Sequence, residues 1–139
     1  MGLTLVPRRA KNLQGIARAF QKFRSEGFLG VVVTADAFFN NHRPEIIAEA
    51  KDEDGIPAIY QWRAFVEAGG LISYGPSIEQ AYKKAGEYVA RILLGANPAN
   101  MACSEPDPFK LVVRRATADS LGLVIPVPHI LDGKPFTVI

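Results

Sequence analysis

The stretch Gly55–Ser77 constrains the fold of this chain more than any other part of the sequence. It holds two short apolar runs, Ile56–Tyr60 and Leu71–Tyr74, separated by a short helical stretch, Arg63–Ala68, that two glycines end. Both runs finish in aromatic and turn residues. In an open α/β sheet, small ligands bind at the carboxyl ends of the strands. We therefore expect two strands whose carboxyl ends form the edge of a small-molecule-binding lobe.

Two longer helices are predicted on either side of this stretch by their caps and their periodicity. Asn12 is a good N-cap, and apolar residues then recur at helical spacing through Leu13–Ser25. Ser77 is the expected N-cap of the longest helix, whose apolar face extends to Leu93 before Gly95 ends it. The remaining expected elements are the strands Leu3–Val6, Phe28–Thr34 and Phe109–Val113, a helix that begins at Pro44, and the helix Ala116–Leu121.

The alternation of these strands and helices predicts an α/β fold. We expect a mostly parallel sheet with flanking helices, because strands that alternate with helices are usually joined by crossovers. The run Phe28–Thr34 is a continuous series of apolar and β-branched residues, so both faces of the strand would be apolar. This is typical of a strand inside a parallel sheet that helices cover. The segment Leu123–Ile139 shows little periodicity and is expected to pack as an extended arm or to be loose.

Composition excludes several classes of protein. The net charge is +2 with scattered basic residues, whereas nucleic-acid binders usually carry a concentrated basic face. Cys103 is the single cysteine, so it has no internal disulfide partner and no second thiol for a metal pair. No apolar run approaches the roughly 20 residues that span a bilayer. The N-terminus does not resemble a secretory signal, so the chain as given is expected in the cytoplasm.

The sequence carries no recognisable enzyme motif. It lacks a phosphate loop, a dinucleotide-binding fingerprint, a zinc-protease motif and a nucleophile elbow. His42 and His129 are far apart in the chain, and packing or surface roles are favoured for both over catalysis. A thiol nucleophile would need a partner near Cys103, and none is local to it. We therefore expect no catalytic residues, no metal site and no cofactor.

The candidate ligand-binding residues lie near the predicted strand ends: Asp36, Phe38, Tyr60, Trp62 and Tyr74. Asp36 comes just after an apolar strand, where a carboxylate can meet a ligand amine or hydroxyl, and capping of a turn or helix explains it equally well. Phe38 is expected either to stack on a ligand or to cover the sheet edge, and covering the edge is slightly favoured. The other three aromatics have polar tips, which suits either a cleft wall or a bridge between core and solvent.

Beyond these patterns, the chain resembles a known family. The resemblance is carried by the order of motifs in Gly55–Leu94, then Pro98-Ala99, then FKLVVRRATADSLGLVIP at Phe109–Pro126. It is similar in these stretches to the C-terminal portion of ABC transporter substrate-binding proteins of the tryptophan/tyrosine-transport type. The likeness extends from Leu3 to about Pro126.

The resemblance implies one lobe of a type I periplasmic-binding-protein fold, in which a ligand is trapped between two lobes by hinge closure. Residues 1–126 would form the second lobe, residues 127–139 an extended tail, and the N-terminal lobe would be absent. The five candidate residues would then form one wall of the cleft. An intact relative would act in the periplasm or cell envelope and deliver a small organic solute, such as an amino acid or a related compound, to an ABC permease.

Two other functions stay open at this point. An enzyme or sensor lobe uses the same α/β frame, because fold does not fix function. Alternatively, the chain is a truncated remnant that only self-associates, as a homo-oligomer joined through its exposed cleft face, since an uncovered apolar patch favours association.

Overall fold

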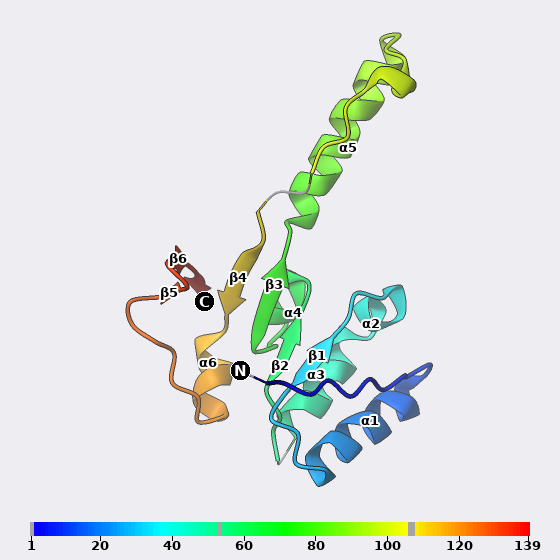
Figure 1. Ribbon diagram of the computed structural model, residues 1–139. Coiled ribbons are helices and arrows are strands. Elements are labelled where there is room, and N and C mark those ends of the chain that lie inside the picture. Colours follow the sequence, from blue (N-terminus) through cyan, green and yellow to red (C-terminus); the bar gives the residue numbers. More distant parts are fainter. Residues whose placement is uncertain (1, 53, 106–107) are drawn as a thin grey trace.

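The computed structural model describes residues 2–52, 54–105 and 108–139. In chain order, its elements are α1 (Leu13–Ser25), β1 (Val31–Val33), α2 (Ala37–Asn41), α3 (Arg43–Lys51), β2 (Ala58–Tyr60), α4 (Arg63–Glu67), β3 (Ile72–Gly75), α5 (Ile78–Leu93), the 3₁₀-helix η1 (Pro98–Asn100), β4 (Lys110–Val113), α6 (Arg115–Ser120), β5 (Ile130–Leu131), β6 (Lys134–Pro135) and β7 (Thr137–Val138). These elements form a body built on one sheet, from which α5 projects (Figure 1).

The main sheet has five strands in the order β1-β2-β3-β4-β7. The first three strands are parallel to one another, β4 is antiparallel to β3, and β7 is parallel to β4. Helices flank this sheet, so the predicted mostly parallel α/β fold is confirmed. Because β1, β2 and β3 are parallel neighbours, their carboxyl ends lie along one edge, as the stretch Gly55–Ser77 predicts.

One face of the sheet carries the core. Its register places Val33 beside Tyr60, and Tyr60 beside Ser73, so these side chains form a row on the same face. Helix α1 packs on α3, and α4 packs against β2 and β3. The buried apolar cluster drawn from these elements consists of Ile16, Phe20, Val31, Ile46, Ile47, Ala50, Ile56, Ala58, Tyr60 and Phe65.

The N-terminal part of the predicted sheet is wrong in two respects. Leu3–Val6 is not a strand but an exposed segment, and no backbone hydrogen bond within the described residues joins it to β1. The run Phe28–Thr34 gives only the short strand β1, which lies at the edge of the sheet rather than inside it. Both differences have the same cause. A strand lies inside a sheet only where it is paired on both sides, and among the described residues β1 pairs only with β2.

The predicted helices follow their capping residues closely. Asn12 Oδ1 accepts a hydrogen bond from the Gly15 amide at 2.8 Å, and α1 has the predicted bounds. Ser77 Oγ accepts from the Gln80 amide at 3.3 Å at the start of α5. Between β1 and α3 lies the short helix α2, which is not among the helices expected from the sequence. Asp36 begins this helix as its N-cap, which explains how a polar stretch becomes helical.

Helix α5 projects from the body and is followed by a segment that runs back along it (Figure 1). The Tyr88 hydroxyl donates to the Ala102 carbonyl at 2.6 Å, and Lys84 Nζ donates to the Glu105 carbonyl at 3.0 Å. None of the residues of α5, all of which the structure describes, is buried. The predicted apolar face of this helix is therefore present but uncovered in the described chain.

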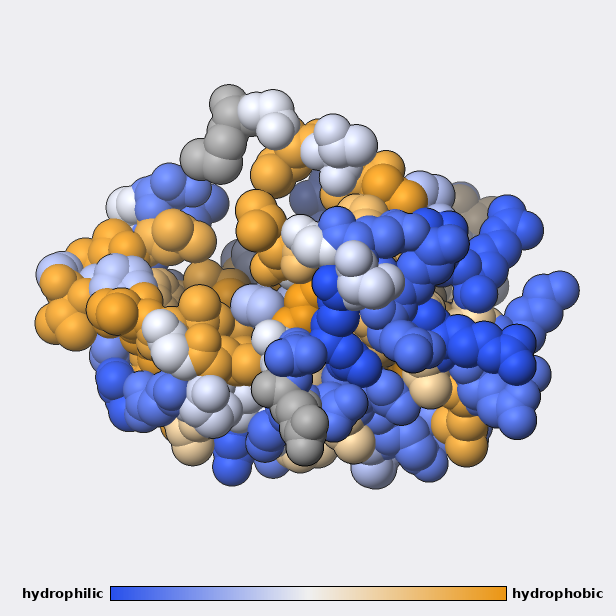
Figure 2. Space-filling view, turned by 90° about the horizontal axis from the view of Figure 1, so that it is seen from below, coloured by the Kyte–Doolittle hydropathy of each residue, from blue (hydrophilic) through white to orange (hydrophobic). Residues whose placement is uncertain are grey.

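The C-terminal tail is more ordered than the sequence suggests. Strands β5 and β6 form a hairpin, whose turn residues Asp132 and Gly133 both have positive φ. Strand β7 then joins the main sheet beside β4, and the Arg115 amide donates to the Ile139 carbonyl at 2.9 Å. The last residues therefore belong to the sheet. Seen from below, hydrophobic residues gather on the half of the molecule that carries this tail, and hydrophilic residues on the half that carries α1 (Figure 2).

Candidate functional site

The carboxyl ends of β1, β2 and β3 each lead into the first turn of a helix, namely α2, α4 and α5. The N-caps of these helices are Asp36, Trp62 and Ser77. Since the three strands are parallel neighbours, the three helix starts lie along the same edge of the sheet, which we call the carboxyl edge. Helix N-termini carry partial positive charge and unpaired amides, so this edge favours an anionic group.

Asp36 and Phe38 lie at the β1 end of the carboxyl edge. Asp36 is exposed, and its Oδ1 accepts a hydrogen bond from the Phe38 amide at 2.7 Å. Capping therefore accounts for one carboxylate oxygen. Phe38 is half-buried, and its ring centroid lies 4.5 Å from that of His42 and 5.8 Å from that of Phe39. The Phe38 ring is thus packed partly against the core.

Tyr60 lies behind the carboxyl edge, in the core. Its side chain is 2% exposed, and its ring stacks on that of Phe65 with centroids 4.6 Å apart and planes at 11°. Gly70 approaches this ring so closely that a side chain there would collide with it. The hydroxyl finds no hydrogen-bond partner among the described residues. Burial raises the pKa of this hydroxyl above its ordinary value, which keeps it neutral.

Trp62 and Tyr74 lie at the ends of the other two parallel strands. Trp62 is half-buried against the core, and its indole Nε1 is buried with no hydrogen-bond partner in the described part of the chain. Tyr74 is 52% exposed, and its ring meets that of Phe109 edge-on, with centroids 5.3 Å apart. Trp62 thus holds an unsatisfied donor, and Tyr74 presents its ring to solvent.

The structure brings Asp36, Trp62 and Tyr74 to three successive strands along one edge, with Phe38 beside Asp36 and Tyr60 behind them. A cavity of about 480 Å³ lies between the N-terminal segment, α1 and β1, and one of about 430 Å³ lies near Arg24 and Pro57. None of the five candidates, all of them described, lines either cavity. The carboxyl edge is therefore separate from both of these cavities.

The remaining polar candidates are separate from one another. His42 Nδ1 lies 3.5 Å from a Glu45 carboxylate oxygen, whereas His129 Nε2 lies 3.4 Å from an Arg115 nitrogen on another part of the surface. Cys103 is exposed. No group of three metal-ligating side chains occurs within the described ranges. The contact of His42 with Phe38 was not predicted, although their i,i+4 spacing would have signalled it once α2 was recognised as a helix.

Three solved structures show the same fold. A conserved domain protein from Vibrio cholerae O1 biovar El Tor matches with a TM-score of 0.78 at 22% identity, over 94% of this chain and 43% of its own length. An ABC domain in complex with L-Trp from Streptococcus pneumoniae matches with a TM-score of 0.78 at 23% identity, over 94% and 44%. A substrate binding protein with adhesive properties from Clostridium difficile, in a ligand-free, open structure, matches with a TM-score of 0.60 at 20% identity, over 94% and 42%.

This chain therefore spans less than half of the length of each of these neighbours. No curated protein matches it significantly. Within the described residues, no helix has both the length and the apolar character needed to cross a membrane. The family described as ABC transporter substrate binding protein matches residues 1–132, which is nearly the whole chain. The chain therefore belongs to the ABC transporter substrate binding protein family.

Proposed function

We propose that this chain supplies one wall of a solute-binding cleft that serves an ABC uptake transporter. The wall is the carboxyl edge, and its surface side chains are Asp36, Phe38, Trp62 and Tyr74, with Tyr60 packed behind them. The observation that carries this proposal is the meeting of three helix N-termini with aromatic and acidic side chains at one edge of a parallel sheet. Binding there requires no covalent chemistry.

The chemistry of this wall suits a small zwitterion with an apolar side chain. The exposed Asp36 carboxylate can accept from a ligand ammonium group, and the start of the 16-residue helix α5 favours a ligand carboxylate. Trp62 and Tyr74 offer aromatic surface for the side chain. An amino acid or a related solute meets all three requirements, and the Streptococcus pneumoniae neighbour holds L-Trp.

A single wall buries only part of a ligand, whereas small-molecule sites bury most of it. Because this chain spans less than half of its neighbours' length, we propose that the opposite wall comes from a second lobe. Delivery to an ABC permease, in the periplasm or elsewhere in the cell envelope, follows from membership of the family and is proposed on that basis.

Thermal unfolding of the purified chain with and without a panel of amino acids tests the proposal. A solute at about 100 times its dissociation constant should raise the free energy of unfolding by about 2.7 kcal/mol. Asp36→Asn keeps an N-cap of similar quality but removes the charge, so it should abolish that shift with little effect on the free protein. Asp119→Asn, at an exposed position of α6, is the matched control. An unchanged response of Asp36→Asn, or no response to any solute, would contradict the proposed wall.

A second candidate function is self-association, which the uncovered apolar side chains of α5 favour. Tyr82, Val89 and Leu93 are all exposed on this helix. Sedimentation equilibrium over a range of concentrations tests it. A mass that stays that of a monomer at high concentration would exclude this function.

A further inference from the structure

The outer side of α1 and the segment that leads into it carry an excess of positive charge. Residues 8–26 hold six basic residues and a single acidic one, Glu26. The other ten of the chain's 16 Lys and Arg residues are outnumbered by the other 13 of its 14 acidic residues. The net charge of +2 is thus the sum of a strongly basic region and an acidic remainder. Such an asymmetry suggests contact with an anionic partner, as in nucleic-acid or membrane binding.

The fold places α1 so that its basic residues face away from the body. The helix buries Ile16 and Phe20 against the core. Residues two apart on a helix are separated by about 200°, so Arg18, which is two residues from each of them, points away from the core. Lys22 follows one turn later and is also exposed. Seen from below, hydrophilic residues gather over this half of the molecule (Figure 2).

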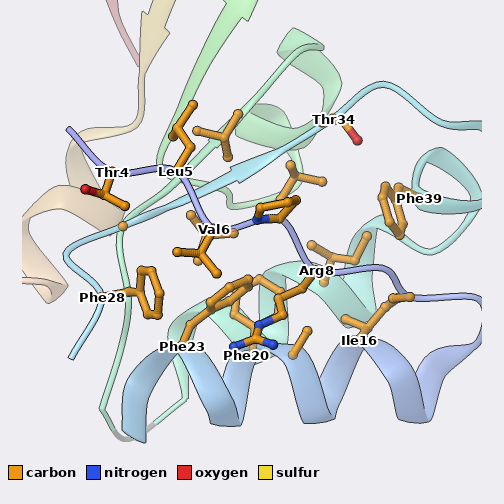
Figure 3. A pocket seen from close by; sticks show the side chains of 18 residues that line it. Thr4, Leu5, Val6, Arg8, Ile16, Phe20, Phe23, Phe28, Thr34 and Phe39 are labelled. Atoms are coloured by element: carbon orange, nitrogen blue, oxygen red, sulfur yellow. The ribbon is translucent and has the colours of Figure 1, made fainter. Parts of the chain in front are cut away.

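The segment before α1 adds further cations to the same region. Arg8 reaches toward α1 from the N-terminal segment (Figure 3), and its Nη2 lies 3.1 Å from one carboxylate oxygen of Glu26. Lys22 Nζ lies 3.5 Å from the other oxygen of Glu26, so these two cations lie close together. Arg9 and Lys11 are exposed just before the helix begins. We call the following five residues the basic face: Arg8, Arg9, Lys11, Arg18 and Lys22.

The described chain does not neutralise this face. Glu26 is shared by two of the five cations, and the side chains of the other three make no ion pair or hydrogen bond with any described residue: Arg9, Lys11 and Arg18. Arg24 is different, because it already lies within 4 Å of carboxylates of Glu49 and Asp52 and is therefore not counted in the face. Five cations against one carboxylate leave a clear excess of positive charge.

We propose that the basic face docks this chain on a lipid bilayer that contains anionic headgroups. Such a bilayer presents many negative charges in one plane, so it attracts a basic surface without a matching shape. Each Lys or Arg near the bilayer should strengthen binding by about fivefold. The basic face contains none of the five wall residues, so docking does not require solute binding.

The chemistry of the face favours a bilayer over a protein or a small anion. Beyond its first residue, α1 exposes polar residues only: Gln14, Arg18, Gln21, Lys22 and Ser25. The binding energy of protein interfaces is concentrated in packed pockets, often around Trp and Tyr, and this side of α1 has neither. A specific site for a small anion would need a buried cation, whereas all five cations are exposed.

The choice of a bilayer over nucleic acid rests on the proposed function, because an ABC transporter lies in a membrane. Single-stranded nucleic acids are usually bound with the help of stacked aromatic side chains. The outer side of α1 offers no exposed aromatic ring. A bilayer requires only the charges that the face already has.

Co-sedimentation of the purified chain with lipid vesicles tests the proposal. The probe is a vesicle of phosphatidylcholine with about one part in three of phosphatidylglycerol, and the reference is a vesicle of phosphatidylcholine alone. We expect binding to the anionic vesicle to be tighter by about a hundredfold. Raising the salt concentration from about 0.05 M to about 0.5 M should abolish it, because salt shortens the distance over which the charges act.

Two triple variants with the same net charge separate the basic face from the total charge. Lys11→Gln/Arg18→Gln/Lys22→Gln should weaken binding to anionic vesicles by on the order of a hundredfold. Lys83→Gln/Arg91→Gln/Lys134→Gln also removes two lysines and one arginine from exposed positions, on α5 and β6, and should weaken binding by less than about threefold.

The first triple variant keeps all five wall residues, so any solute-induced shift in its thermal unfolding should remain. Loss of vesicle binding and loss of the solute response are therefore distinguishable. Should this variant fail to fold, Arg18→Gln alone decides, with an expected loss of about fivefold.

Several outcomes would overturn the proposal. Absence of binding to anionic vesicles at low salt, or equal binding to both kinds of vesicle, would show that the face is an ordinary solvated surface. Equal losses in the two triple variants would assign binding to net charge rather than to the basic face. Tighter binding to a soluble glutamate oligomer than to anionic vesicles would assign the face to an acidic protein, and tighter binding to a DNA duplex would assign it to nucleic acid.

Discussion

Helices α1 and α5 have the same kind of sequence pattern, yet only α1 is part of the core. Both are amphipathic, and each begins with a side-chain cap, Asn12 or Ser77. Helix α1 buries Ile16 and Phe20 against α3 and the sheet, whereas α5, which is described in full, buries no residue. An amphipathic pattern therefore shows that a helix has a face to cover, but not what covers it.

The difference has an energetic consequence. Most helix stability in proteins comes from tertiary packing rather than from propensity. We infer that α1 unfolds together with the body, whereas α5 can open locally, because its described contacts are mainly with the segment that returns beside it. Each of the following variants tests whether a residue belongs to the cooperative body or to the projecting helix.

The largest contrast is expected between two aromatic residues. Phe20→Ala empties a site in the core where the side chain is 4% exposed, so it should lower the free energy of unfolding by about 3–5 kcal/mol. Tyr82→Ala removes a ring that is 75% exposed on α5 and should change it by no more than about 0.5 kcal/mol. Urea unfolding followed by circular dichroism measures both. A large cost for Tyr82→Ala would mean that α5 is covered in solution, and the contrast would fail.

The junction between body and helix should give the next largest effect. Gly75 ends β3 just before α5, and a Cβ atom there would overlap the Gln61 carbonyl oxygen. Gly75→Ala should therefore cost about 1–3 kcal/mol in urea unfolding. Gly86→Ala, in the open middle of α5, is the matched control, because a Cβ atom there would meet open space and alanine favours helix. A loss of stability in Gly86→Ala equal to that in Gly75→Ala would contradict this account.

How far the sequence predicts this structure depends on whether the signal is local. The caps Asn12 and Ser77 act on amides three residues away, so both helix starts could be predicted. The Arg63–Glu67 ion pair, at 2.7 Å, is likewise local, because side chains at i and i+4 are neighbours on a helix. The edge position of β1 could not be predicted in the same way, because it depends on whether another strand pairs with it.

In the candidate site, too, some features could be predicted from nearby residues, whereas others depend on tertiary contacts. Asp36 was expected just past an apolar strand, and the structure places it there, as the cap of α2. The burial of Tyr60 could not be predicted, because Ile59 and Tyr60 are both apolar enough for a core and the sequence does not reveal which face α4 covers. A surface role was therefore as reasonable as a core role for this residue until the register with β1 and β3 was known.

Substitution of Tyr60 should have a smaller effect on the stability of the body. Because its buried hydroxyl has no partner among the described residues, Tyr60→Phe should raise the free energy of unfolding by about 1 kcal/mol in urea at neutral pH. Its folded-state pKa is raised, so above about pH 10 the unfolded chain loses this proton while the folded chain keeps it, and stability falls as pH rises. That part of the pH dependence should vanish in Tyr60→Phe and persist in Tyr82→Phe. A destabilised Tyr60→Phe would reveal a hydrogen bond to the hydroxyl.

The two helix caps give the smallest effects and the most direct test of cooperativity. Asn12→Ala and Ser77→Ala each remove one capping bond, worth about 1 kcal/mol to its helix. If α1 unfolds with the body, Asn12→Ala lowers the free energy of global unfolding by that amount. If α5 opens by itself, Ser77→Ala leaves global unfolding unchanged and instead speeds amide exchange in the first turn of α5. Equal losses in global unfolding would mean that α5 is held by the body as firmly as α1. The uncovered face of α5 would then be a property of its surface alone and not of its stability.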